Sequence, residues 1–336
     1  MEKGIRITRT GSNKNLGTRE NMKLVMINDC ASVGETLLKY MPATVEKQHI
    51  KRTRGTWSKT FGVAYEILKA KGDLYHANYL LQDCYIASIL GKKPLVGYAM
   101  GSDVRAYSQH WMWGRIVRHN VKACDKILVS TPDLISIGKR YRKDIEYLPP
   151  PVDTELFHAK PLVSHSGKKR VLIASNVDWQ GKGTDIAIRA LSKMTNEVDV
   201  SIIAHGSDLK KTIDLASSLG LSLNVLPKVS HDQMNRYYWD ADLVMDQFLC
   251  ECPGMTSLEA ITCGRPAVTN VSPIMPELEE FPLKNVNSAE KIVETIRETF
   301  TNPEILAKEQ RYVAANHRID VVVNKLMTIY DSILKR

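Results

Sequence analysis

From Met22 onward, short apolar runs alternate with longer segments of helical period. This alternation predicts βαβ units, in which helices join parallel strands. The predicted strands of the first half are 23–27, 73–77, 94–98, 126–130 and 145–148. Those of the second half are 170–174, 198–204, 223–226, 243–245 and 266–270, and the clearest helical segments are 35–41, 80–90 and 184–194. We therefore predict an α/β fold.

Three consecutive prolines, 149–151, stand between the two series of units. Proline cannot extend a helix or a central strand, so this run marks a boundary. We predict two Rossmann-like parallel-sheet domains, residues 1–155 and 156–315, which face each other across a cleft. The amphipathic pattern of 311–336 predicts a closing helix, and we expect residues 316–336 to pack back on the first domain.

Composition agrees with two folded domains. The 336 residues exceed what one hydrophobic core usually serves. A content of 43% hydrophobic and 25% charged residues excludes a disordered chain. The 46 Lys and Arg outnumber the 37 Asp and Glu, and the net charge of +9 favours anionic partners: nucleotides, phosphorylated lipids, acidic membrane surfaces or nucleic acid.

The cysteines and the apolar runs indicate the cellular setting. The six cysteines are scattered, without a Cys-x-x-Cys pair or a histidine cluster, so we expect neither a zinc site nor a disulfide framework and favour a reducing cytoplasm. The first twenty residues are polar and basic, and no later run approaches a membrane span. We therefore expect no signal peptide and no transmembrane helix.

The most informative segment for chemistry runs from Glu251 to Glu259, with Pro253 and Gly254 predicting a turn before a helix. Free backbone N–H groups and the positive end of that helix would face the cleft, where they suit a diphosphate. Glu259 is then placed to bind the hydroxyls of a ribose, and Glu251 those of a sugar. A helix start with a capping carboxylate explains Glu259 but leaves Glu251 without a role.

This segment resembles the Glu-x7-Glu signature of glycosyltransferase family 4, the retaining GT-B enzymes. The match covers both glutamates, the intervening glycine and the tail Glu-Ala-x-x-Cys-Gly-x-Pro at 259–266. The resemblance implies a GT-B fold, a donor-sugar contact for Glu251 and a ribose contact for Glu259. It also implies that the residues between them contact the donor phosphates: Gly254, Met255, Thr256 and Ser257.

A second resemblance lies in the loop Asp178–Thr184, which matches the Lys-Gly element of the family. Lys182, flanked by Gly181, would neutralise charge on the leaving diphosphate. The family usually has an arginine about five residues earlier, which this chain lacks. Either Lys182 acts with less help, or another base such as Lys228 or Arg265 supplies the second cation. The alternative is an ordinary turn with a solvated lysine.

In the first half, Asp103 follows a predicted strand and lies at the carboxyl edge of the sheet, where α/β proteins bind ligands. Asp103 is the leading candidate for an acceptor or sugar contact, and His76, at the end of an earlier strand, is the second. A histidine that braces the core is the alternative for His76. Gly34 matches the position of a family loop that approaches the donor phosphates.

Residues 105–122 mix aromatic and basic side chains, and 51–54 read Lys-Arg-Thr-Arg. Such a mixture suits the surface of an anionic membrane, and lipid-linked acceptors are common in the family the chain resembles. A buried aromatic face with solvated bases is the alternative.

These observations together predict a retaining glycosyltransferase that moves a sugar from a UDP- or GDP-sugar to a glycan or lipid-linked acceptor. The second half would bind the donor and the first half the acceptor. We expect no metal and no cofactor beyond the nucleotide sugar, and no nucleic acid partner. A sugar-nucleotide epimerase on the same scaffold and a basic nucleic-acid-binding protein are the alternatives.

Overall fold

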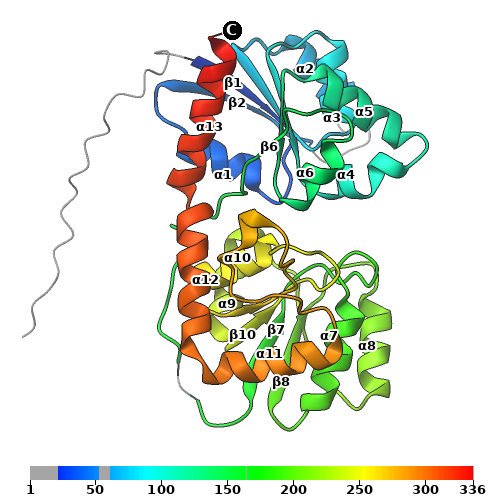
Figure 1. The fold of residues 1–336 in the computed structure, drawn as a ribbon, viewed down its shortest axis with the longest axis vertical. Coiled ribbons are helices and arrows are strands. Elements are labelled where there is room, and N and C mark those ends of the chain that lie inside the picture. The colour runs from blue at the N-terminus through cyan, green and yellow to red at the C-terminus, as the bar shows by residue number, and fades with distance from the viewer. Residues whose placement is uncertain (1–21, 53–60, 164, 336) are drawn as a thin grey trace, which may run out of the picture.

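The computed structural model describes residues 22–52, 61–163 and 165–335 (Figure 1). Each half of the chain forms a parallel sheet with helices packed against it, and the two halves are stacked along the long axis of the molecule. The predicted α/β class is thus confirmed.

The first domain has a six-stranded parallel sheet in the order β2-β1-β3-β4-β5-β6. Its strands are β1 (Met22–Ile27), β2 (Val45–Ile50), β3 (Leu74–Asn78), β4 (Leu95–Ala99), β5 (Lys126–Val129) and β6 (Glu146–Tyr147). Its helices are α1 (Val33–Tyr40), α2 (Val63–Lys69), α3 (Gln82–Ile89), α4 (Ser102–Arg105), α5 (Trp113–Ala123) and α6 (Asp133–Gly138). The predictions missed β2, because this edge strand buries only its two end residues fully and has no apolar run.

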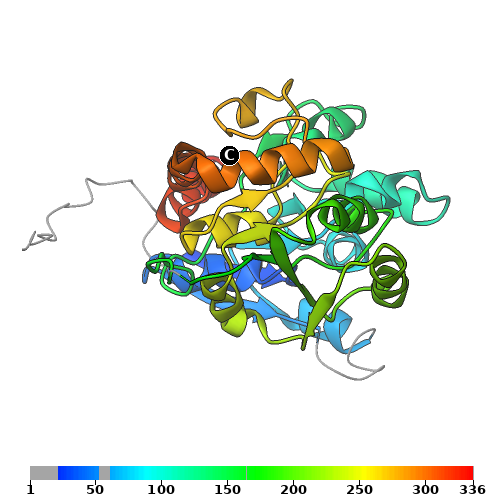
Figure 2. The same cartoon turned by 90° about the horizontal axis from the view of Figure 1, so that it is seen from below.

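The second domain has a five-stranded parallel sheet in the order β11-β10-β7-β8-β9. Its strands are β7 (Lys169–Ile173), β8 (Val198–Ile203), β9 (Leu223–Leu226), β10 (Leu243–Met245) and β11 (Ala267–Val268). Its helices are α7 (Thr184–Leu191), α8 (Leu209–Ser218), α9 (Met234–Asp240), α10 (Met255–Thr262), α11 (Ala289–Thr301) and α12 (Pro303–Asn316). Helix α7 packs between α8 and α11, as the view from below shows (Figure 2). Central strands such as β10 are apolar throughout because helices cover both of their faces.

The predicted single helix over 311–336 is interrupted. Helix α12 ends at Asn316, and α13 (Ile319–Leu334) starts three residues later and runs up the first domain, where it packs beside α1 (Figure 1). The break lies where the chain crosses the linker: the Val152 N–H donates to the His317 carbonyl at 2.9 Å, and His317 Nδ1 lies 2.9 Å from the Pro150 carbonyl. Two chain segments therefore connect the domains at one point.

Candidate active site

A buried carboxylate holds the start of helix α10. Asp246 follows β10 directly, and its Oδ2 accepts hydrogen bonds from the backbone N–H of Gly254 (2.9 Å) and Ser257 (3.3 Å) and from the Ser257 hydroxyl (2.8 Å). A Cβ on Gly254 would lie 2.4 Å from that oxygen, so the site needs glycine. Within the described residues, the N–H groups of Met255 and Thr256 have no hydrogen-bond partner. The positive end of the helix thus keeps donors for an anion.

This end of α10 faces the gap between the domains. Met255 packs against apolar clusters of both domains. Cys252 Sγ lies 3.8 Å from Asp133 Oδ1 at the start of α6 in the first domain. The positions for which phosphate contacts were predicted therefore lie at the domain interface. Ser257 is nevertheless fully buried, and its N–H and hydroxyl both donate to Asp246.

Lys182 lies beside the loop that leads into α10. It occupies the turn between β7 and α7, next to the exposed Gly181, and its ammonium group donates to Gln247 Oε1. The side-chain amide of Gln247 donates to the Cys252 carbonyl at 2.7 Å. Gln247 therefore ties the predicted phosphate lysine to the segment that contains Glu251.

The two bases considered as the second cation lie in different surroundings. Arg265 is buried, and its guanidinium donates to the carbonyls of Lys160 (2.9 Å) and Trp239 (2.8 Å), which gives it a structural role. Lys228 is exposed, with its Nζ 3.3 Å from His205 Nδ1.

A cation that the sequence did not single out comes from the opposite domain. Arg105 at the end of α4 makes a two-pronged ion pair with Asp133, at 2.7 and 3.0 Å, and donates to the Thr131 hydroxyl at 3.0 Å. Burial raises the pKa of Asp133, but Arg105 outweighs this effect and the net pKa is lowered. The ionised pair lies next to Cys252, across the gap from the Lys182 loop. No local pattern pairs positions 105 and 133, so only the fold reveals it.

The two predicted acids differ in exposure. Glu259 is 3% exposed, and its carboxylate accepts hydrogen bonds from His231 Nε2 (2.7 Å) and from the Tyr238 hydroxyl (2.9 Å). Glu251 is exposed, and its carbonyl accepts the Ser272 N–H at 3.0 Å. Burial lowers the pKa of His231, but the bond to Glu259 outweighs it and the net pKa is raised. Sequence reasoning gave no role to His231.

A cavity of about 500 Å³ opens beside His231, between the domains. Its walls are α1, the linker and the turn before α9, with Ser32, Glu35, Lys39, Asp153, His231 and Asp232 among the lining residues. Gly34 is buried behind this wall: its N–H donates to Asp29 Oδ1 at 3.1 Å, and a Cβ there would lie 2.7 Å from Asn78 Nδ2. The close approach that requires glycine at position 34 is thus to Asn78.

Residues 156–318 match the family model described as glycosyl transferases group 1. The matched segment spans the second domain, from before β7 to the end of α12. The structure is similar to Anabaena Alr3699/HepE in complex with UDP and glucose, with a TM-score of 0.72 and 14% identity over 93% of this chain and 100% of that chain. It is also similar to sucrose-phosphate synthase of Thermosynechococcus elongatus, with a TM-score of 0.69 and 14% identity over 93% of this chain and 98% of that chain.

A third similar structure is the lipopolysaccharide outer core galactosyltransferase WaaB, with a TM-score of 0.62 and 14% identity over 93% of this chain and 100% of that chain. No curated protein matches the chain significantly. The shared fold is the predicted GT-B fold, and the family match over the second domain supports a glycosyltransferase. Neither finding favours the epimerase or the nucleic-acid-binding alternative.

Asp103 lies inside the first domain. It has no exposed surface, and its carboxylate accepts backbone N–H groups of the turn around it, at 2.8 to 3.2 Å: those of Leu80, Met100, Gly101 and Val104. Burial raises the pKa of Asp103, and these bonds oppose the effect. The predicted acceptor or sugar contact is corrected accordingly, because Asp103 braces the turn after β4.

His76 also belongs to the core. It is fully buried, with Nδ1 2.6 Å from the Tyr330 hydroxyl of α13 and its ring edge-on to Tyr98. Burial lowers its pKa to about 3, so the ring is neutral. The predicted sugar contact is replaced by a structural one, in which His76 anchors α13 to β3.

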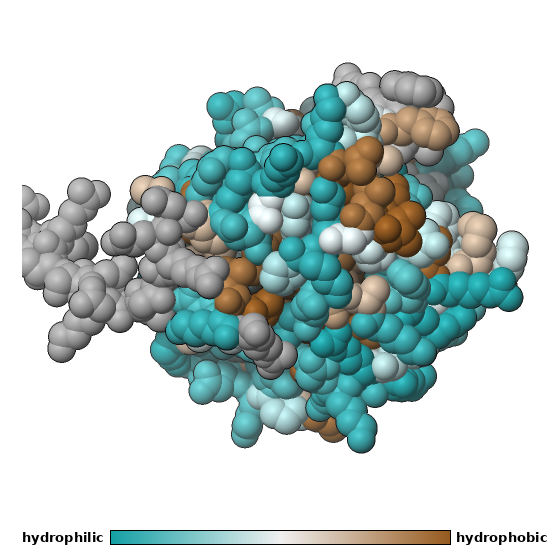
Figure 3. Space-filling view, turned by 90° about the horizontal axis from the view of Figure 1, so that it is seen from above, coloured by the Kyte–Doolittle hydropathy of each residue, from teal (hydrophilic) through white to brown (hydrophobic). Residues whose placement is uncertain are grey.

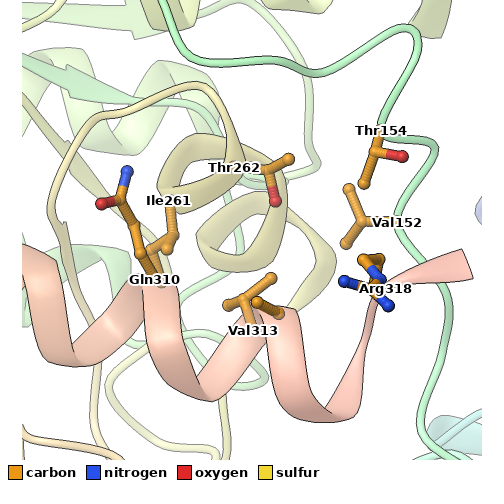
Figure 4. A pocket seen from close by; sticks show the side chains of 8 residues that line it. Val152, Thr154, Ile261, Thr262, Gln310, Val313 and Arg318 are labelled. Carbon is orange, nitrogen blue, oxygen red and sulfur yellow. The ribbon is translucent and has the colours of Figure 1, made fainter. Parts of the chain in front are cut away.

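A smaller pocket of about 190 Å³ lies at the opposite end of α10 (Figure 4). Figure 4 shows Ile261 and Thr262 of α10 facing Val313 of α12 and Val152 of the linker. This pocket borders the linker at Val152 and is separate from the tip of α10 at Gly254.

The described residues contain no cluster of three or more potential metal ligands and no helix long and apolar enough to cross a membrane. One Asp-x-Asp sequence, 240–242, precedes β10, and Asp242 accepts bonds from His165 (2.8 Å) and from the Arg170 N–H (2.7 Å). Asp242 therefore lies at the end of β10 that is remote from the tip of α10.

Arg54 of the basic run 51–54 lies outside the described residues.

Proposed function

We propose that this glycosyltransferase takes a sugar from a UDP- or GDP-sugar and transfers it with retention to a glycan or lipid-linked acceptor. One observation carries the donor assignment: the tip of α10, with the available N–H groups of Met255 and Thr256, faces the domain gap beside Lys182. A helix start combined with a lysine suits a diphosphate. The sugar would extend toward Glu251, which is exposed on the same loop.

The ribose belongs, in this proposal, to Glu259 acting together with His231. Both oxygens of the Glu259 carboxylate are engaged, and His231 stands between it and the cavity. The imidazole can donate to a ribose hydroxyl while Glu259 orients the ring from behind. We therefore expect the nucleoside in the cavity between α1 and the turn before α9.

For the chemical step we propose displacement on one face of the sugar, in which the leaving phosphate helps to remove the acceptor proton. Lys182 and the tip of α10 would stabilise the charge that builds on the diphosphate. Arg105 of the first domain approaches the same loop from the other side, but Asp133 neutralises it, so Lys182 is the cation that this proposal assigns to the diphosphate. We propose that the reaction uses no metal ion.

The donor assignment is tested by thermal shift with UDP, GDP and their sugars. The wild type should gain Tm with one nucleotide series, and Glu259→Ala and Lys182→Ala should lose most of that gain. Lys210→Ala is the matched control, since Lys210 is exposed on α8. Unchanged nucleotide protection in Glu259→Ala contradicts the ribose assignment. Conversion of the nucleotide sugar to an isomer without any acceptor would instead reveal an epimerase.

We further propose a cytoplasmic location with peripheral contact to the membrane. All six cysteines are unpaired, and Cys84 and Cys124 remain thiols at an Sγ–Sγ distance of 3.6 Å, which suits a reducing compartment. Exposed apolar side chains gather on the first domain (Figure 3), with Leu68 56% and Ile89 58% exposed. Flotation with anionic and with zwitterionic vesicles tests the membrane contact, and equal absence of binding to both refutes it.

A further inference from the structure

The first domain contains a second pocket, of about 290 Å³, beside α3 and α4. It lies past the carboxyl ends of β1 and β3, at the sheet edge where α/β proteins bind ligands. Its lining combines three aromatic rings with planar polar groups: Tyr79, Tyr107, Trp113, Asn28, Arg52 and Asp83. This volume is at the small end for ligand sites and suits one ring better than an extended chain.

The aromatic rings of this pocket are held in place by specific contacts. Tyr79 has a φ of +80°, a left-handed conformation that bulky residues rarely adopt. Its hydroxyl lies 2.6 Å from Ser102 Oγ at the start of α4. Tyr107 and Trp113 meet edge to face, with ring centroids 6.4 Å apart. The rings remain partly exposed, so their faces are available to an apolar ligand face.

The pocket offers no unpaired charge among its described lining residues. Arg52 makes a two-pronged ion pair with Asp83 at 2.8 and 2.6 Å, and Asp83 is buried. A phosphate would need a free cation here, which this neutralised pair does not supply. The pocket therefore selects a ligand that is uncharged and rich in hydroxyl groups, with one apolar face.

The geometry points to a binding site for one uncharged pyranose ring of the acceptor, stacked on Trp113 and Tyr107 and hydrogen-bonded along the edge formed by Asn28 and the Arg52–Asp83 pair. This inference rests on the proposed function, in which the first domain binds the acceptor. Helix α4 connects the two sites: it starts with Ser102 at this pocket and ends with Arg105 at the interface with the Lys182 loop. Three residues, about 4.5 Å of helical rise, separate Ser102 from Arg105.

Saturation-transfer NMR with simple probes tests the site. The probes are the methyl pyranosides of glucose, galactose and mannose, N-acetylglucosamine, and glycerol 3-phosphate as the anionic probe, each with and without UDP or GDP. At least one pyranoside should bind, and Trp113→Ala and Tyr107→Ala should weaken its binding about tenfold. Trp113→Phe keeps a ring face and should retain most of the affinity. Trp111→Ala is the matched control, because Trp111 is 74% exposed and does not line the pocket.

The outcomes separate this inference from the proposed function. Nucleotide protection without any pyranoside binding, or pyranoside binding that survives in Trp113→Ala, overturns the acceptor pocket and leaves the donor site standing. Preferential binding of glycerol 3-phosphate also overturns it. If neither UDP, GDP nor their sugars raises the Tm of the wild type, the proposed function itself is refuted. Nucleotide protection measured on each variant shows that its fold is intact.

Discussion

Replacing Gly254 by alanine sets a methyl group against the carboxylate that holds the start of α10. The added Cβ would lie 2.4 Å from Asp246 Oδ2, and this oxygen accepts the N–H groups of Gly254 and Ser257 and the Ser257 hydroxyl. Asp246 is 3% exposed, so its carboxylate has no free space into which to retreat. The mutation should therefore weaken all three hydrogen bonds together.

Two opposing effects determine the change in stability. Weakening hydrogen bonds to a buried carboxylate costs about 2 kcal/mol. Gly254 has φ −86° and ψ 173°, which alanine adopts without strain, so the mutation also restricts the unfolded chain and stabilises by about 0.7 kcal/mol. The net loss is about 1.3 kcal/mol, which lowers Tm by roughly 4 °C.

Urea unfolding of four proteins tests this reasoning as a double-mutant cycle with Asp246→Ala. Without the carboxylate the methyl group meets no obstacle, so Gly254→Ala should become stabilising by about 0.7 kcal/mol in that background. A loss of equal size in both backgrounds would refute the proposed clash. Gly254→Ala should also reduce the Tm gain from UDP or GDP, because the N–H groups at the tip of α10 move with it.

Further predictions concern single residues. The pKa of His231 is raised in the folded protein. Its pair with Glu259 therefore stabilises the fold fully below the unfolded-state histidine pKa of about 6.5, and this stabilisation is lost as pH rises through the folded-state pKa. The Tm difference between wild type and His231→Asn should accordingly shrink from pH 5.5 to pH 8.5. Lys182→Ala should lower kcat for sugar transfer about 100-fold with little change in Tm, and an unchanged kcat contradicts its role. Asp103→Asn should lose about 2 kcal/mol of stability in urea unfolding, whereas a loss of kcat at unchanged stability would restore a catalytic role.

The fold class was predictable because the strands of a parallel sheet are buried on both faces and stand out as apolar runs. The runs that became β1, β7 and β10 were each recognised to within a residue or two. The edge strand β2 was missed, since its middle residues are polar and face solvent. The break between α12 and α13 was also missed, because the contact of His317 with the linker comes from residues far away in the sequence.

Only part of the candidate site could be inferred from local sequence. The turn and helix of the Glu251–Glu259 segment were predictable from proline, glycine and the hydroxyl residues. Asp246 also carried a usable signal, since it directly follows a strand, and Asp103 comes four residues after the end of one. The same signal was misleading for Asp103, because position after a strand does not reveal whether a carboxylate points to the cleft or to its own turn.

The sequence by itself determined the alternation of strands and helices, the proline linker and the segment that resembles a donor-binding motif, because these depend on residues close together in the chain. Only the tertiary structure decided which polar groups are already paired. Asp246 accepts the Ser257 hydroxyl, His231 is hydrogen-bonded to Glu259, and Arg105 forms an ion pair with Asp133 at the domain interface. Such pairings arise between residues brought together by packing, and the cost of burying an unpaired polar group makes them decisive for what remains free to bind a ligand.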